Sequence, residues 1–556
     1  MPLIDTVSPS LSPPFVARLL SPQAGCQKGR CARVAVIVFV LCCWLAGGVA
    51  AATQAESMAG QEHPSSTQAI AWYPGSTKAA FAEAKAANKP LFLYWGAVWC
   101  PPCEEIKQTV FISPEFIALS KLFVPVYLDG DTESAQTWGE RFGVRGYPTM
   151  IVFNPAGEEV TRIPGGINLA RYTEVLGSSL ANLRSIESLI VWALSEPERL
   201  RAADYNQIAY YSWWQENLHL QDDITSAELA QLAASALQAG NTMAGHRLQL
   251  TALIFRYMEE QSLSAEERAL AYQQLSGLLA DTGEVRNNLD LFSYWSEELV
   301  TLVTEPGAER ERLVDLWQMA LRPFRHDPAI VTAEQLATWY SELYLFWMIH
   351  PEAEALPEAV EAELLADIDA ADQHTRGSAR QAVINKAYQL LKAAKRYEAA
   401  RSLLLAELDK SAEPYYFMSG LAGIEVALGN KHAAVEWYQK AYATAQGPAT
   451  RFQWGVNYIN NAIDLEPEEV AQINGALAGL LAELPKASDV FTGRNYVRLQ
   501  RLLAALAQWP GRNKNGVVDQ FIADLQAACK QTGPDTIAAS NCHSLPALTV
   551  GQGLKG

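Results

Sequence analysis

The chain has 556 residues, of which 49% are hydrophobic and 19% charged, and its formal net charge is −18. This much apolar material excludes a disordered or collagen-like chain. The acidic balance argues against a nucleic-acid partner, because phosphate binding needs a basic surface. At about 100–200 residues per domain, the length predicts several domains. A single stretch is apolar enough to enter a bilayer, which excludes a polytopic membrane protein.

The first fifty residues have the pattern of an export signal. Arg30 and Arg33 precede an apolar run at residues 34–46, and small residues follow. A positive flank, an apolar core and a small-residue exit are typical of a cleaved secretory signal peptide, predicted at residues 1–52. The alternative is an uncleaved anchor in the inner membrane at residues 34–52. Both interpretations place the rest of the chain outside the cytoplasm, and we expect it in the bacterial periplasm.

After a short polar linker at residues 53–68, strand-like and helix-like patterns alternate along the chain. They predict helices at residues 77–88, 104–110 and 132–142, and strands at residues 90–95, 122–128, 149–153 and 158–163. Such alternation indicates one compact α/β domain, which we place at residues 69–184.

The character of the chain changes at residue 185, and helical spacing continues to about residue 515. We predict a large all-α, helical-repeat-like region there. Two consecutive helix pairs, predicted at residues 379–394 with 397–408 and 415–428 with 431–445, repeat in register, so that Ala400 and Ala434 occupy equivalent positions. These pairs weakly resemble tetratricopeptide repeats, in which a small residue lets paired helices pack closely. Stacked helix pairs form concave surfaces, so we expect this region to bind partner proteins.

The motif that carries chemistry is Trp99-Cys100-Pro101-Pro102-Cys103, which follows a buried strand and opens a helix. Zinc sites use the same cysteine spacing, but they need four ligands, and the sequence has no second such pair or close histidine pair. A thiol at a helix N-terminus faces unpaired N–H groups and the positive end of the helix dipole, which stabilise the thiolate. We therefore expect Cys100 to be an exposed nucleophile with a low pKa. Cys103, one turn further and more buried, would resolve the mixed disulfide.

These features resemble the thioredoxin superfamily over about residues 72–180. The resemblance rests on the apolar strand before the motif, on the motif itself and on Gly146-Tyr147-Pro148-Thr149 before the strand at residues 149–153. It implies that Pro148 is a cis-proline lying against the cysteine pair. It also implies that Trp99, Tyr147 and Pro148 bind the substrate. The segment after the motif looks most like the exported thioredoxin-like domains of bacterial thiol-disulfide interchange reductases.

One position departs from the family's pattern. Many members have a buried acid six residues before the first cysteine, and this chain has Tyr94 there. In the family that acid assists proton transfer to the second thiol. Here a water or another carboxylate would take its role, with Glu104, Glu105 and Asp129 as the candidates, or turnover would be slower.

A second cysteine pair lies in the segment at residues 516–556, which we predict to be a C-terminal tail. Cys529 and Cys542 are 13 residues apart around a Gly-Pro turn. In an oxidising compartment they are expected to form a structural disulfide. Closing a loop of this length stabilises the fold by about 3 kcal/mol in the loop-entropy model.

The sequence thus predicts an exported thiol-disulfide oxidoreductase whose helical region binds partners. It would need no cofactor or metal beyond the Cys100–Cys103 disulfide. Its partners would be disulfide-containing client proteins and a membrane or soluble thiol electron donor or acceptor. The alternative from another class is a non-catalytic scaffold, in which the helical array recruits partners and the thioredoxin-like part is a docking module or thiol sensor. A copper(I) metallochaperone is a third interpretation, because soft thiolates bind that ion.

Overall fold

The computed structural model describes residues 69–545, apart from Arg145, Pro164 and residues 166–168, 214–223, 485–489, 513–515 and 533–535. The predicted signal peptide or anchor and the predicted linker lie outside the described residues. Within the part of the chain that is described, no helix is both long enough and apolar enough to cross a bilayer.

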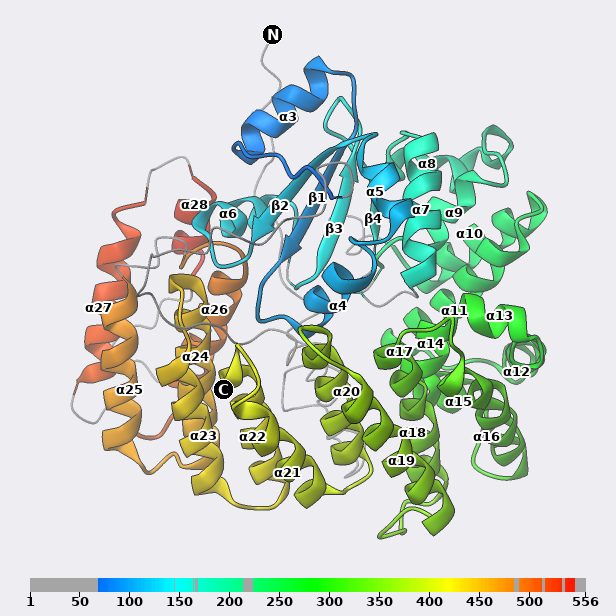
Figure 1. The fold of residues 1–556 in the computed structure, drawn as a ribbon. Coiled ribbons are helices and arrows are strands. Elements are labelled where there is room, and N and C mark those ends of the chain that lie inside the picture. Colours follow the sequence, from blue (N-terminus) through cyan, green and yellow to red (C-terminus); the bar gives the residue numbers. More distant parts are fainter. Residues whose placement is uncertain are drawn as a thin grey trace. The chain divides into compact units, whose positions relative to one another are not determined.

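The α/β domain is built on a four-stranded sheet in the order β2-β1-β3-β4 (Figure 1). Its central strand β1 is parallel to β2 and antiparallel to β3, and β3 is antiparallel to β4. All six residues of β1 are buried, because both faces of a covered sheet contribute side chains to a core. The elements of this domain are α3 (Thr77–Ala86), β1 (Leu91–Gly96), α4 (Pro101–Thr109), α5 (Pro114–Ser120), β2 (Val124–Asp129), α6 (Glu133–Arg141), β3 (Thr149–Phe153), β4 (Glu159–Ile163) and α7 (Leu169–Ala181).

Helices make up the rest of the described chain, so the predicted fold class of an α/β domain followed by a large all-α region is confirmed. The first half of the all-α region contains α8 (Ile186–Ser195), a 3₁₀ turn (Pro197–Arg199), α9 (Asp204–Ala209), α10 (Ser226–Gln238), α11 (Thr242–Met258), α12 (Ala265–Ala280), α13 (Thr282–Asn287), α14 (Leu289–Tyr294), α15 (Ser296–Val303), α16 (Ala308–Leu321), a second 3₁₀ turn (Arg322–His326), α17 (Thr332–Ala337), α18 (Trp339–Ile349) and α19 (Glu358–His374).

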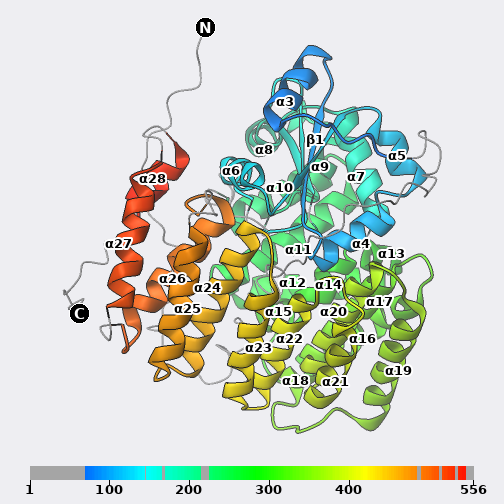
Figure 2. The same ribbon diagram turned by 60° about the vertical axis from the view of Figure 1, so that its left-hand side comes forward.

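The second half of the all-α region begins at α20 (Ala379–Ala393), which contacts α4 of the α/β domain. It also contains α21 (Tyr397–Leu408), α22 (Pro414–Ala427), α23 (Lys431–Thr444), α24 (Pro448–Leu465), α25 (Val470–Glu483), α26 (Gly493–Gln508), α27 (Val517–Cys529) and α28 (Ile537–His543). Helices α27 and α28 belong to the segment that we predicted as a tail. They lie at the outer edge of the array beside α25 and α26 (Figure 2), and Val518, Phe521 and Leu525 are buried there.

The two predicted helix pairs correspond to α20–α21 and α22–α23. The turn within each pair contains a residue with positive φ, Lys395 at +59° and Gly429 at +82°. Both turns therefore use the left-handed conformation that commonly ends a helix, although only the second has glycine there. Ala400 and Ala434 are fully buried between paired helices. Membership of a particular repeat family stays a prediction.

Both faces of the sheet share their cores with the all-α region. On one face, Leu93 and Trp95 belong to a buried cluster that includes residues of α17–α22. On the other face, Phe92 and Tyr94 belong to a cluster with residues of α7–α11. Alternate residues of one strand point to opposite faces, so β1 connects two sets of helices that are distant in sequence.

Glu298 in α15 offers a pH test of the all-α region. Its side chain is buried, and its Oε2 is without a hydrogen-bond partner among the described residues. Burial raises the pKa of this carboxyl to about 8, whereas the unfolded chain ionises near the ordinary value of 4.5. The folded state therefore holds a proton that the unfolded state has lost, so the stability contributed by Glu298 falls as the pH rises between these two values.

We predict that Glu298→Gln matches the wild type in thermal stability at pH 4 and exceeds it increasingly up to pH 8. The gain would have an upper bound of about 5 kcal/mol above that pH. Melting temperatures of the two proteins across this range test the expectation. A constant difference at every pH would contradict it.

Candidate active site

Cys100 stands at the turn between β1 and α4. Its N–H donates to the carbonyl oxygen of Ala97 (3.2 Å), and its extended backbone makes it the N-cap of α4. Pro101 and Pro102 occupy the first helical positions, where a missing N–H costs no hydrogen bond. The N–H of Cys103 donates to Cys100 Sγ (3.3 Å). Cys100 Sγ thus lies at the positive end of the α4 dipole, where negative charge on sulfur is stabilised.

Cys100 and Cys103 form a disulfide in the structure, with Cα atoms 5.1 Å apart. The pair is therefore in its oxidised form, and accepting two electrons would return it to two thiols. In the reduced form, the helix N-terminus would favour a thiolate at Cys100, whereas apolar burial would oppose it.

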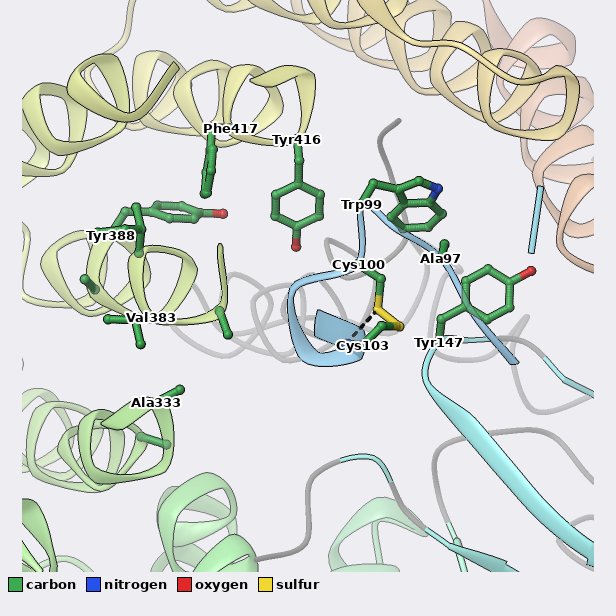
Figure 3. Packing of buried hydrophobic residues seen from close by; sticks show 14 of the residues in the cluster. Ala97, Trp99, Cys100, Cys103, Tyr147, Ala333, Val383, Tyr388, Tyr416 and Phe417 are labelled. Carbon is green, nitrogen blue, oxygen red and sulfur yellow. Dashed lines mark hydrogen bonds between the residues drawn. A yellow bond between two sulfur atoms is a disulfide. The ribbon is translucent and has the colours of Figure 1, made fainter. Parts of the chain in front are cut away.

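The predicted exposure of Cys100 is wrong. Cys100 and Cys103 are both 0% exposed. The cause is tertiary, because Tyr416 and Phe417 of α22 belong to the same buried cluster as the disulfide (Figure 3). The local sequence predicts an exposed turn at Cys100. The turn is buried because residues from distant helices pack in the same cluster.

The residues expected to bind substrate gather around the disulfide. Trp99 and Tyr147 meet edge to face with ring centroids 5.9 Å apart, and both belong to the cluster that contains the cysteines. Tyr147 precedes Pro148 across a cis peptide bond, and Pro148 is also buried. Gln136 Nε2 donates to the hydroxyl of Tyr147 (3.1 Å). Burial raises the pKa of that hydroxyl, so it stays protonated at neutral pH.

Tyr94, at the position of the family's buried acid, donates its hydroxyl to the carbonyl oxygen of Cys103 (3.5 Å). Burial raises its pKa well above the ordinary value, so it cannot serve as a base near neutral pH. Of the candidate carboxylates, Glu104 pairs with Lys107 (2.8 Å), and Asp129 Oδ1 accepts from the N–H of Asp131 (3.1 Å).

Glu105 has a different environment from the other two carboxylates. Its Oε1 is buried without a hydrogen-bond partner among the described residues, and burial raises its pKa to about 7. Lys386 of α20 opposes this shift, and burial lowers the pKa of Lys386 to about 8. Residues two apart on a helix do not share a face. Glu105 is therefore directed toward α20 rather than toward Cys103, and a proton acceptor for Cys103 stays unassigned.

Two residues of the all-α region contact the site and were not predicted. Gln381 Nε2 of α20 donates to the carbonyl oxygen of Trp99 (2.6 Å). The guanidinium of Arg494 in α26 lies 5.4 Å from the ring centroid of Trp99 and 4.5 Å from that of Tyr147. Neither residue belongs to a motif, and no local pattern connects either of them with Cys100.

Cys529 and Cys542 are joined in the structure, with Cα atoms 5.8 Å apart. The pair connects the end of α27 to α28, and Cys542 is buried in the cluster formed with α24–α26. Within the described residues, no group of three or more histidine, cysteine, aspartate or glutamate side chains is placed to hold a metal ion.

Comparison with known proteins places the redox motif inside a recognised domain. Residues 77–179 match the family model of a thioredoxin-like domain. Over 107 residues the chain is 32% identical to thiol:disulfide interchange protein DsbD 1 of Pseudomonas aeruginosa, which is 18% of each chain. Over 85 residues it is 35% identical to thioredoxin H4 of Arabidopsis thaliana, covering 15% of this chain and 66% of that relative. The match thus spans about a fifth of the first relative and just under two thirds of the second. No solved structure gives a significant match.

The Cys529–Cys542 disulfide is expected to affect stability and not activity. Replacing both Cys529 and Cys542 by serine should lower the free energy of unfolding by about 3 kcal/mol, because the unfolded chain loses its cross-link. Thiol-disulfide exchange at Cys100 should stay unchanged. Denaturant unfolding and an exchange assay on the same variant test the two statements. Loss of exchange in a folded variant would instead make this pair part of the redox site.

Proposed function

We propose that this chain, in which a domain of the thioredoxin superfamily at residues 77–179 is joined to a large all-helical region, is an exported thiol-disulfide oxidoreductase. It would reduce or exchange disulfides in client proteins. The observation that carries the proposal is the Cys100–Cys103 disulfide at the N-terminus of α4, with the Cys103 N–H directed at Cys100 Sγ.

The chemistry follows from this geometry. In the reduced protein, the Cys100 thiolate attacks one sulfur of a client disulfide. The client S–S bond breaks, a Cys100–client disulfide forms, and one client thiolate leaves. Cys103 then loses its proton and attacks Cys100 Sγ, which forms the Cys100–Cys103 disulfide and releases the second client thiolate. Two electrons have moved from the protein to the client, and a thiol-containing donor returns them to the protein.

Trp99, Tyr147 and Pro148 would guide the client to the sulfur. The family resemblance assigns backbone presentation to the residue before the cis-proline, and Tyr147 holds that position next to Trp99. The buried hydroxyl of Tyr147 is fixed by Gln136 and also donates to the carbonyl oxygen of Gly130 (3.3 Å). These contacts fix Tyr147 to α6 and to the β2–α6 loop, so part of its support comes from a helix.

The proposed setting is an oxidising compartment, supported by the export signal expected at residues 1–52 and by the Cys529–Cys542 pair. The helical region would bind the client or the donor. The scaffold alternative would need no reactive thiol, so the reactivity of Cys100 separates the two hypotheses.

Replacing each cysteine separately tests the assignment of roles. Cys100→Ser should lower the rate of insulin disulfide reduction roughly 10³-fold or more, because the nucleophile is lost. Cys103→Ser should accumulate a covalent complex with the client, because nothing resolves the mixed disulfide. Turnover by dithiol-reduced full-length protein and non-reducing mass analysis measure the two effects.

The C529S/C542S double variant is the matched control, since it removes the other pair and leaves the motif intact. Equal turnover in wild type and Cys100→Ser would overturn the enzyme proposal and favour the scaffold. Trapping by Cys100→Ser rather than by Cys103→Ser would reverse the assigned roles.

A further inference from the structure

The all-helical region occupies the surface that the proposed function needs for its client. Trp99, Cys100 and Tyr147 are each no more than 2% exposed. For exchange, a client sulfur has to reach bonding distance of Cys100 Sγ, and Cys100 is fully buried in a cluster that also contains residues of α20 and α22 (Figure 3). The buried state seen here therefore cannot accept a client disulfide.

The first contact that closes the site involves the backbone next to the nucleophile. The carbonyl oxygen of Trp99 directly precedes Cys100, and it accepts a hydrogen bond from Gln381 Nε2 (2.6 Å). A client strand pairing with this turn would have to displace the Gln381 amide. Helix α20 thus provides, from the same chain, a polar group bound to the backbone next to the nucleophile.

The second contact covers the docking side chains. The Arg494 guanidinium packs over both Trp99 and Tyr147, and Arg494 is only 3% exposed. Its backbone N–H donates to Gln136 Oε1 (3.1 Å), and the neighbouring N–H of Gly493 donates to Glu140 Oε2 (2.8 Å). Two residues of α6 therefore accept from the first turn of α26 and hold Arg494 in place.

The third contact repeats this arrangement at α24. Its N-cap residue is Gly447, which provides no side-chain cap, and Asp131 from the β2–α6 loop accepts from the N–H of Thr450 instead (2.8 Å). A Cβ atom at Gly447 would lie 1.4 Å from Asp131 Oδ2. The two elements thus approach so closely that a side chain at residue 447 would force them apart.

These contacts can also be exchanged for water. Carboxylate, amide and guanidinium groups that are paired in the closed state regain hydrogen bonds with water when the elements separate, so each net loss is small. Helix capping contributes about 1 kcal/mol per cap in typical cases. The shared apolar cluster adds to these bonds and keeps the closed state favoured, so the open state is a minor one in which the sheet and the helices stay folded.

We propose that the all-helical region is an internal cover of the redox site, and that exchange at Cys100 requires prior separation of α20 and α26 from the Cys100 turn and of α24 from the neighbouring β2–α6 loop. This inference rests on the proposed function, because it concerns access to the same sulfur. Opening and chemistry are then successive steps. At low reductant concentration the observed rate is the chemical rate multiplied by the fraction of open molecules, and at high reductant concentration it approaches the rate of opening.

The test follows reduction of the oxidised full-length protein by dithiothreitol. Two electrons and two protons pass to the Cys100–Cys103 disulfide, and dithiothreitol becomes its cyclic disulfide. Samples are quenched with a maleimide, and peptide mass analysis reports labelling at each cysteine. In the wild type, the rate should level off at high dithiothreitol concentration, because opening becomes limiting.

Variants of the cover should raise this limiting rate. We expect an increase of about fivefold for Gln381→Ala, from loss of one hydrogen bond, and of about tenfold for Arg494→Ala. Gln381→Glu keeps the size of the side chain, places a carboxylate against the Trp99 carbonyl and should act in the same direction. Melting temperatures of all variants show whether opening is local or reflects global unfolding.

Matched controls exist elsewhere in the helical region. Gln231 Nε2 also donates to a backbone carbonyl, that of Leu194 (2.8 Å), and the Arg199 guanidinium also packs on a tryptophan, Trp192 (4.1 Å). Gln231→Ala and Arg199→Ala should leave the limiting rate at the wild-type value. Acceleration by these controls equal to that of the cover variants would assign the effect to general destabilisation and overturn the proposal.

Cover variants that are reduced at the wild-type rate at every dithiothreitol concentration would also overturn the cover. The assay uses a small reductant and no client, so it is independent of the proposed enzyme activity. Insulin reduction measured on the same proteins tests that activity separately. Faster dithiothreitol access without any insulin reduction would reject the oxidoreductase and keep the cover.

Discussion

The backbone turn from Trp99 to Cys103 is bound from two sides, by the α/β domain and by the all-helical region. From the α/β domain, Ala97 and the N-terminus of α4 fix Cys100 at the positive end of a helix. From the all-helical region, Gln381 and Arg494 bind Trp99 and Tyr147. The first set of contacts makes Cys100 chemically suited to exchange, whereas the second set prevents a client protein from reaching it.

Capping explains how two parts of such different architecture fit together. Helices α24 and α26 begin with residues that give them no side-chain cap. Asp131, Gln136 and Glu140 of the α/β domain provide the acceptors instead. Unpaired N–H groups at a helix start need acceptors, and in the closed state these three side chains provide them. The backbone N–H groups at the starts of α24 and α26 thus help to orient the helical array, because they bind acceptors of the α/β domain.

The sequence was most informative where structure is local. The strand predicted at residues 149–153 is β3 within the same limits, and the helices predicted from the repeat correspond to α20–α23 within two residues. Apolar runs and capping residues determine these elements from neighbouring positions. The placement of Cys100 at a helix start followed from the same kind of signal. The burial of Cys100 could not be predicted in this way. Gln381 and Arg494 are distant from it in sequence, and an amide or a guanidinium can bind many different groups, so nothing in the sequence indicated their partners.

Both the proposed activity and the internal cover require that Cys100 and Cys103 form a reversible redox pair in the folded protein. The decisive experiment equilibrates the full-length protein with a series of glutathione or dithiothreitol buffers and determines by mass which cysteines carry free thiols. We expect a cooperative two-electron transition at this pair, approached slowly, while Cys529 and Cys542 stay oxidised. Reduction of Cys100–Cys103 only under conditions that unfold the protein would contradict it.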